Sequence, residues 1–225
     1  MKKLVLAISM LSIGSLCWAQ SAPPLGSAQT FAVLGASTVT NTDPTIITGD
    51  LGVSPGTALT GFPPGTMTGG SIHAGDATAK AAQAAAHTAY GALAAEPCGT
   101  NLTGKTLGTS PGAVTLSPGV YCFNSSAQLT GTLTLNGNGV YVFKIGSTLT
   151  TASNSTVVLA NGATVGNVFW QVTSSTTLGT NTVFVGSILA LISDTVTTGT
   201  NVTGRVFALT GTVTLSGNRI RAASK

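Results

Sequence analysis

The chain has 225 residues and a formal net charge of +4, yet only 6% of its residues are charged and 43% are hydrophobic. So few charges are unusual for a protein surface in water, and Thr, Ser, Asn and Gly supply the polarity instead. Lys and Arg are few and scattered, which excludes the basic surface that nucleic-acid binding needs. Val, Leu, Ile and Phe recur at strand spacing, which argues against a disordered chain.

The first residues predict export. Lys2 and Lys3 precede an apolar run over residues 4–16, and residues 17–19 (Cys-Trp-Ala) offer a signal-peptidase cleavage site. The run is too short to span a bilayer comfortably, so a retained anchor is the weaker alternative. We expect a signal peptide over residues 1–19 and a secreted, extracellular or periplasmic product. Residues 20–225 are then expected to form a single domain, monomeric and without membrane contact.

Two cysteines remain after export. Cys17 leaves with the signal peptide, whereas Cys98 and Cys122 form an even pair in an exported chain. We therefore expect one disulfide between Cys98 and Cys122, and two free buried thiols are the alternative.

Strand patterns and one helix make up the first half of the exported chain. Ala, the strongest helix former, dominates residues 74–95, so we expect one helix there, about 33 Å long. Pro97 ends it, and Tyr90 and Leu93 are its expected anchors. The strands expected before it, separated by Pro- and Gly-containing turns, cover residues 31–34, 37–40 and 45–48.

Beyond Cys98 the chain becomes a repeat. Six turn segments recur 19, 16, 27, 20 and 17 residues apart, and five of them end in Asn, which tolerates left-handed turn geometry. One strand type in the repeat is apolar on both faces, as at residues 140–143 and 168–171, and another is apolar on one face only. In later coils a third strand lies between them, at residues 155–159 and 182–185.

Such a repeat predicts an all-β-dominated fold, a right-handed three-sided β-solenoid (β-helix) with the long Ala-rich α-helix packed alongside. The regular coils are expected over about residues 106–220. Strands that are apolar on both faces are buried on both sides, so the helix should cover those strands.

The strand that is apolar on one face carries a recurring phrase, Thr-Leu/Val-Thr. Residues i and i+2 of a strand share a face, so each phrase turns two hydroxyls outward and one apolar side chain inward. Stacked coils would then present a two-column grid of Thr. The alternative is that Thr is frequent only because it suits strands. The phrase occupies residues 132–134, 148–150, 195–197 and 212–214, with a looser copy at 175–177 and a further copy at 38–40.

Little supports catalysis. No two carboxyl groups repeat at coil spacing to form a facing pair, and His73 and His87 lack a neighbouring nucleophile motif or ligand cluster. We expect no enzyme activity, no metal and no cofactor, and we expect Asp50 to bond backbone amides in a turn. The acidic residues of the exported chain are Asp43, Asp50, Asp76, Glu96 and Asp194.

Several stretches together resemble the ice-binding, or antifreeze, proteins with the DUF3494 fold. The resemblance covers nearly all of the exported chain, and it implies a triangular β-solenoid with a helix alongside and a flat ice-binding face. The stretches that carry it are residues 31–36 (FAVLGA), 48–56 (TGDLGVSPG), 72–76 (IHAGD), 118–121 (PGVY), 139–145 (GVYVFKI) and 167–172 (NVFWQV).

The resemblance also implies a motif, Thr-Ala/Gly-x-Thr/Asn, on the ice-binding face, which residues 151–154 and 198–201 match. The expected function is that of a secreted protein that adsorbs to ice, gives thermal hysteresis and inhibits ice recrystallisation. An adhesin or polysaccharide-binding solenoid is the alternative. The residues expected to contact ice are Thr132, Thr134, Thr148, Thr150, Thr151, Ser175, Thr177, Thr195, Thr197, Thr198, Thr212 and Thr214.

Overall fold

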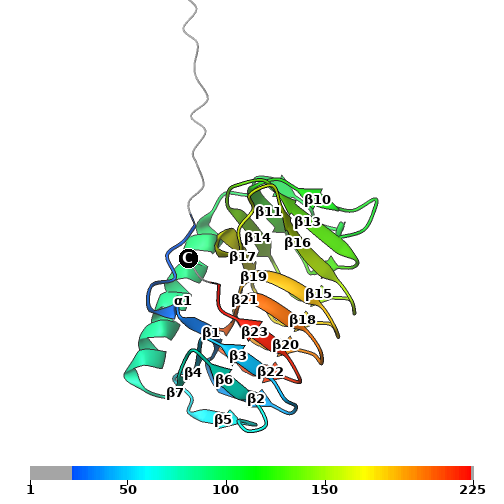
Figure 1. Cartoon of the computed structure of the whole chain (residues 1–225). Coiled ribbons are helices and arrows are strands. Elements are labelled where there is room, and N and C mark those ends of the chain that lie inside the picture. Colours follow the sequence, from blue (N-terminus) through cyan, green and yellow to red (C-terminus); the bar gives the residue numbers. More distant parts are fainter. Residues whose placement is uncertain (1–21, 224–225) are drawn as a thin grey trace, which may run out of the picture.

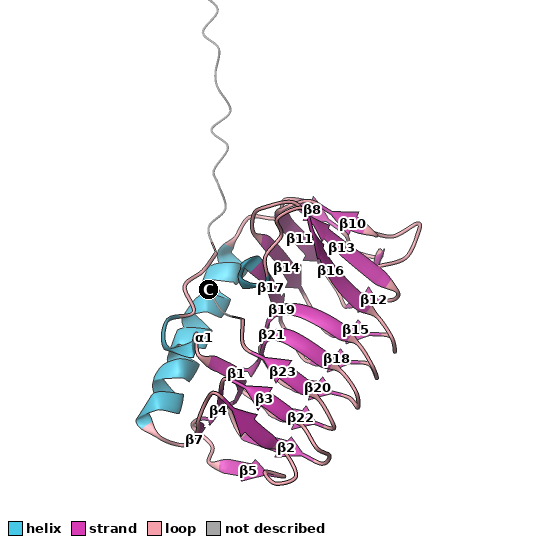
Figure 2. Cartoon of the chain, viewed as in Figure 1, coloured by secondary structure: helices cyan, strands magenta, loops and turns pink. Residues whose placement is uncertain are grey.

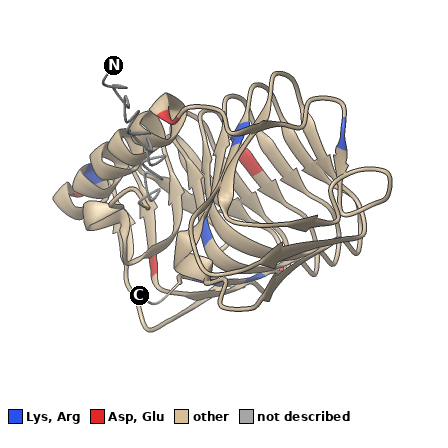
Figure 3. Ribbon diagram, turned by 90° about the horizontal axis from the view of Figure 1, so that it is seen from above, with Lys and Arg blue, Asp and Glu red and all other residues tan. Residues whose placement is uncertain are grey.

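The computed structural model describes residues 22–223, so the signal peptide predicted over residues 1–19 lies outside the described residues. The chain winds into stacked coils with one helix along the side (Figures 1 and 2). Seen along the stack, the strands surround a common interior and the helix lies beside the solenoid (Figure 3). Neighbouring coils pair in parallel, which confirms the predicted three-sided β-solenoid with a helix alongside.

The three sides of the solenoid are called here the β2 side, the β3 side and the helix side. The β2 side is an eight-stranded sheet. Its strands, in spatial order, are β5 (Ala58–Thr60), β2 (Thr38–Asn41), β22 (Val213–Leu215), β20 (Asp194–Val196), β18 (Thr176–Leu178), β15 (Leu149–Thr151), β12 (Ala127–Leu129) and β9 (Thr106–Leu107).

The other two sides share one larger sheet, because β19 and β21 run across the corner between them. The β3 side contains β6 (Thr66–Thr68), β3 (Ile46–Thr48), β23 (Arg219–Arg221), the first halves of β21 (Asn201–Ala208) and β19 (Val183–Ala190), β16 (Thr156–Ala160), β13 (Thr132–Asn136) and β10 (Thr115–Leu116). The helix side contains β7 (Ile72–Ala74), β4 (Asp50–Val53), β1 (Phe31–Gly35), the second halves of β21 and β19, β17 (Val168–Val172), β14 (Tyr141–Ile145), β11 (Gly119–Phe123) and β8 (Thr100–Asn101).

Glycine makes the shared corner possible. Gly186 and Gly204 are register partners with φ of 112° and 143°, a region that side chains rarely adopt. A Cβ on Gly204 would also lie 1.9 Å from the Gly186 carbonyl oxygen. The two strands can therefore turn the corner only without side chains at these positions.

Apolar side chains fill the interior, and an aromatic stack runs through it. The ring centroids of Phe143 and Trp170 lie 3.8 Å apart, and Tyr121 and Phe184 extend the stack at 5.5 and 5.0 Å. The Trp170 indole donates to the Val185 carbonyl at 3.0 Å, so its buried N–H is satisfied. Stacked rings of this kind hold successive coils in one register.

The helix α1 (Ala77–Ala95) packs on the helix side, as the doubly apolar strands predicted. Leu93 is buried and Tyr90 is half-buried against the same cluster, which confirms both expected anchors. The small side chains of Ala82, Ala86 and Ala89 let the helix approach the sheet closely. The outward side chains that it covers include Val120, Val142, Phe169, Leu189 and Phe207.

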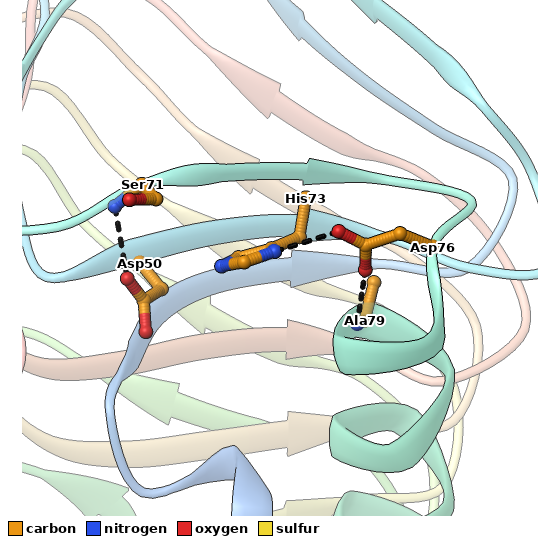
Figure 4. Close-up of polar contacts among 5 residues, drawn as sticks. All are labelled: Asp50, Ser71, His73, Asp76 and Ala79. Carbon is orange, nitrogen blue, oxygen red and sulfur yellow. Dashed lines mark hydrogen bonds and ion pairs between the residues drawn. The ribbon is translucent and has the colours of Figure 1, made fainter.

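The helix begins three residues later than predicted, because residues 72–74 pair as β7 and Asp76 caps the first turn. Asp76 accepts the Ala79 N–H at 2.8 Å and lies 2.7 Å from the His73 ring (Figure 4). These bonds, the Ala79 amide first, lower the pKa of Asp76. Nearby, Asp50 at the start of β4 accepts the Ser71 amide at 2.9 Å, so it bonds a backbone amide as expected (Figure 4).

The end of the helix is fastened to the sheet. Cys98 and Cys122 form the predicted disulfide, with Cα atoms 5.9 Å apart, and Cys122 lies on β11 under the helix. Lys144 of β14 donates to the Glu96 carbonyl, one residue beyond the helix. The disulfide therefore closes the loop between the helix and the first regular coil.

One carboxyl group lies inside the solenoid. Asp194 of β20 is 1% exposed, and its register partner Thr176 of β18 is equally buried. Burial raises the pKa of Asp194 well above its ordinary value, and the Thr176 hydroxyl opposes this only in part. Folding therefore keeps the Asp194 carboxyl neutral at pH values where it ionises in the unfolded chain.

Asp194→Asn should raise stability at neutral pH. Above about pH 4 the unfolded carboxyl ionises while the folded one stays protonated, so the free energy of unfolding of the natural chain falls as pH rises toward the folded-state pKa. We expect the variant to gain on the order of 1 kcal/mol at pH 7 and nothing below pH 4. Thermal melts from pH 3 to pH 9 measure the difference. Asp43→Asn controls for the change in net charge, and equal curves for Asp194→Asn and the natural chain would contradict the assignment.

Reduction of the disulfide should lower the free energy of unfolding by about 3 kcal/mol, because Cys98 and Cys122 are 24 residues apart and the unfolded chain regains the entropy of that loop. The β2 side carries neither cysteine, so its strands should stay intact in the reduced, folded protein. Denaturant unfolding with and without reductant measures the loss. An unchanged midpoint would show that the bond does not constrain the unfolded chain.

Candidate functional site

The β2 side presents one continuous column of outward side chains. The register pairs Thr40 with Thr60 and Thr214, Thr214 with Thr195, and so on to the other end of the sheet. Strand neighbours lie about 4.8 Å apart, so eight positions span about 34 Å. We call this set the central column; in spatial order it consists of Thr60, Thr40, Thr214, Thr195, Thr177, Thr150, Gln128 and Thr106.

Strand alternation produces the column. Six of the eight strands place one residue outward between two inward residues, for example Thr214 between Val213 and Leu215, which are both fully buried. The inward residues anchor each strand in the core, and the parallel pairing fixes the position of each strand along the solenoid axis. Position and spacing of the outward side chains are therefore set by the backbone of the solenoid.

The Thr hydroxyls of the central column are free. Within residues 22–223, none of the seven hydroxyls bonds to another protein group, although each lies on an exposed or half-buried side chain. Thr is β-branched and has few rotamers, so these groups hold their directions without internal bonds. The column therefore offers a row of oriented methyl and hydroxyl groups to whatever lies outside.

A flanking column beside it is bonded internally. The Ser193 hydroxyl accepts the Thr212 amide at 3.1 Å, and the Ser175 hydroxyl accepts the Ser193 amide at 3.3 Å. The Thr148 hydroxyl donates to Ser126 at 2.8 Å. The members Ser126, Thr148, Ser175, Ser193 and Thr212 thus stiffen the sheet edge and have fewer bonds left for an outside partner.

Beyond the other edge of the central column, Thr197 and Thr198 lead into the corner. The register pairs Thr195 with Thr214, not with Thr212, so the phrase at 195–197 is shifted by two residues relative to the expected grid. The Thr197 hydroxyl donates to the Leu178 carbonyl at 2.7 Å, and Thr198 bonds Ser216 at 2.9 Å. Both hydroxyls serve the corner turn.

Thr151 points inward, contrary to expectation. It is 3% exposed, and its hydroxyl lies 2.9 Å from that of Thr182 and accepts the Gly179 amide at 2.8 Å. The next strand behaves similarly, since Thr176 is the buried residue and Thr177 the outward one. At these positions Thr fills the polar inner lining of a corner, so the ice-contact assignment of Thr151 is wrong.

Thr132 and Thr134 lie on the β3 side, because β13 pairs with β10 and β16. The position that β12 contributes to the central column is Gln128. The expected single grid is therefore divided between two sides, and the two sides differ in charge. Arg219 and Arg221 point outward on the β3 side, whereas no strand of the β2 side has an outward charged residue.

Thr60, Thr106 and Gln128 were missed as members of the column. Each lies on a strand of only two or three residues that lacks the doubled Thr phrase. For Gln128, a single polar residue between the apolar Ala127 and Leu129 is the signal that could have found it. The further copy of the phrase at 38–40 does join the column, because Thr40 pairs with Thr214.

The described part of the chain gathers no group of three or more His, Cys, Asp or Glu side chains that could hold a metal ion. Among the same residues, no helix combines the length and the apolarity needed to cross a membrane. His73 bonds Asp76, and the His87 ring lies 3.1 Å from the Leu209 carbonyl, so both histidines have structural contacts.

Known proteins share this architecture and sequence. The family described as Ice-binding-like matches residues 33–221. A relative from Nostoc sp. (strain HG1), named ice-binding protein, is 50% identical over 210 residues, which cover 91% of this chain and 76% of the relative.

Solved structures agree. The crystal structure of an ice binding protein from an Antarctic biological consortium matches with a TM-score of 0.86 and 39% identity, over 98% of this chain and 97% of that one. An ice-binding protein from the Antarctic ascomycete Antarctomyces psychrotrophicus matches with a TM-score of 0.86 and 35% identity, over 91% and 100%. The resemblance seen in the sequence is confirmed, and the chain belongs to the Ice-binding-like family.

Proposed function

We propose that this protein is exported and adsorbs to ice through the β2 side, with the central column as the contact. The observation that supports this most is the run of free Thr hydroxyls at the strand repeat across the whole sheet. The function needs no catalytic group. Adsorbed molecules would curve the ice front between them and so give thermal hysteresis and inhibit recrystallisation.

Ice is a lattice of water oxygens, and a binder must match it without rearranging. The central column repeats about every 4.8 Å along the solenoid, and outward residues of one strand lie about 6.7 Å apart. Stiff Thr side chains lose little rotamer entropy on docking. Their methyl groups favour ordered water between the ridges, and the hydroxyls can join that water as donors and acceptors.

The flanking contacts support the same assignment. Ser175 and Ser193 accept backbone amides, and Thr197 donates to a carbonyl, so the sheet on both sides of the column is held flat by internal bonds. Charged side chains would keep mobile hydration shells over the surface, and the strands here have none facing out. The β2 side is therefore rigid, uncharged and regular at once.

The size of the surface is adequate. The eight strands, with the central column and the residues on either side of it, cover about 34 by 13 Å, on the order of 450 Å². At about 25 cal/mol per Å² the upper bound for burying that area is about 11 kcal/mol. Imperfect fit and ordering of side chains reduce this figure, but many weak contacts acting together suffice for lasting adsorption.

Thr195→Tyr should abolish most thermal hysteresis. A tyrosine ring in the middle of the column would keep the neighbouring Thr177 and Thr214 from contacting a flat ice surface. The sheet is rigid, so it cannot bend to restore that contact. We expect activity below roughly a tenth of the natural value, as for loss of a central contact. Thr132→Tyr is the matched control, because Thr132 is exposed on the β3 side. Loss in the control with activity retained in Thr195→Tyr would contradict the proposal.

Gln128→Thr should increase activity. Gln128 interrupts the column between Thr150 and Thr106, and its long side chain must lose rotamer freedom to lie flat. A Thr at this position would connect the six consecutive Thr positions from Thr60 to Thr150 with Thr106. We expect higher thermal hysteresis at equal concentration and an unchanged melting temperature. Lower activity in the folded variant would mean that Gln128 itself contributes to the contact.

A further inference from the structure

A cavity of about 970 Å³ lies at the corner between the β3 side and the helix side, away from the β2 side. Residues 22–26 close it from one direction, residues 164–167 from another and residues 221–223 from a third. Its volume falls in the range of small-molecule sites. The polar side chains that line it are Gln29, Thr164, Asn167, Thr203, Arg205 and Arg221.

Arg205 forms the inner wall and is 1% exposed. Its guanidinium donates to the Gln29 carbonyl at 2.6 and 3.2 Å, to the Ala223 carbonyl at 2.8 Å, and to the Ser187 hydroxyl at 3.4 Å. These acceptors are neutral, and burial lowers the pKa of Arg205 to about 10. A full positive charge therefore stands in a poorly solvated wall, and no carboxylate within residues 22–223 bonds to it.

Arg221 supplies the reachable donors. It is exposed at the mouth of the cavity, and its guanidinium makes no hydrogen bond or ion pair within residues 22–223. A planar guanidinium matches a carboxylate with two parallel hydrogen bonds. The buried charge of Arg205 adds attraction for an anion, because screening is weak away from water.

None of the lining residues within the described range 22–223 is acidic. The hydroxyls of Thr164 and Thr203 and the amides of Asn167 and Gln29 instead offer paired donors and acceptors, the groups that bind a hydroxylated ligand. One free guanidinium fits a singly charged carboxylate better than a doubly charged phosphate, which would want further donors.

We propose that this cavity binds a small hydroxylated carboxylate, of the sugar-acid class, with its carboxylate on Arg221. The ligand adds a negative charge near Arg205, which no carboxylate of residues 22–223 contacts, and it links residues 22–29 to residues 221–223. The site is separate from the β2 side, so it is independent of the proposed adsorption to ice.

The test compares ligands that differ only in charge. Isothermal calorimetry and thermal shift with D-galacturonate should show binding and a raised melting temperature, and D-galactose should show neither. Arg221→Gln should weaken galacturonate binding about tenfold or more, since a charge-assisted bidentate contact is lost. Raising the salt concentration should weaken binding by the natural protein as well.

Arg219→Gln is the matched control: it removes the same charge from the same strand, but Arg219 does not line the cavity. It should bind galacturonate as the natural protein does, and both variants should keep thermal hysteresis. Acetate tests whether the carboxylate alone is enough for binding, because it lacks the hydroxyl groups of galacturonate. Binding of acetate as tight as that of galacturonate would overturn the sugar-acid class. Equal binding of galactose, no binding of galacturonate, or equal losses in the two variants would overturn the site.

Discussion

Parallel pairing between successive coils is the interaction on which the rest of the structure depends. Each strand bonds to its counterpart one coil away, so every side chain stacks on an equivalent side chain at the strand repeat. Inward positions become ladders, such as the stack from Tyr121 to Phe184, and outward positions become columns. A regular external surface is thus a direct consequence of how the interior is held together.

The three sides then take different roles because their outward residues differ. Apolar outward residues on one side bury against α1, and the disulfide fastens the end of that helix. The β3 side carries Arg219 and Arg221 among Thr and Val. Only the β2 side combines an uncharged outer surface with hydroxyls that the protein leaves unbonded. Hydroxyls at its edges and corners form hydrogen bonds within the protein, so the unbonded hydroxyls lie in the central column.

Much of the fold could be predicted from the sequence. Strand periodicity, the Ala-rich segment and the two cysteines predict the solenoid, the helix and the disulfide, because each depends on local pattern. The site was less predictable, since a column is defined by register between coils. Corner lengths set that register, so Thr195 aligns with Thr214, Thr132 falls on another side and Thr151 turns inward. Isolated outward residues such as Thr60 become visible only after the coils are stacked.

The proposal that only the β2 side touches ice can be tested by blocking each of the three sides in turn. Single cysteines at Thr177, Val183 and Ala84, exposed on the β2 side, the β3 side and the helix respectively, can each be coupled to a bulky polymer, since the natural pair forms a disulfide. Incorporation into a slowly growing ice hemisphere is then measured for the three conjugates. We expect ice to exclude only the Thr177 conjugate. Incorporation of that conjugate at the level of the unmodified protein would contradict it.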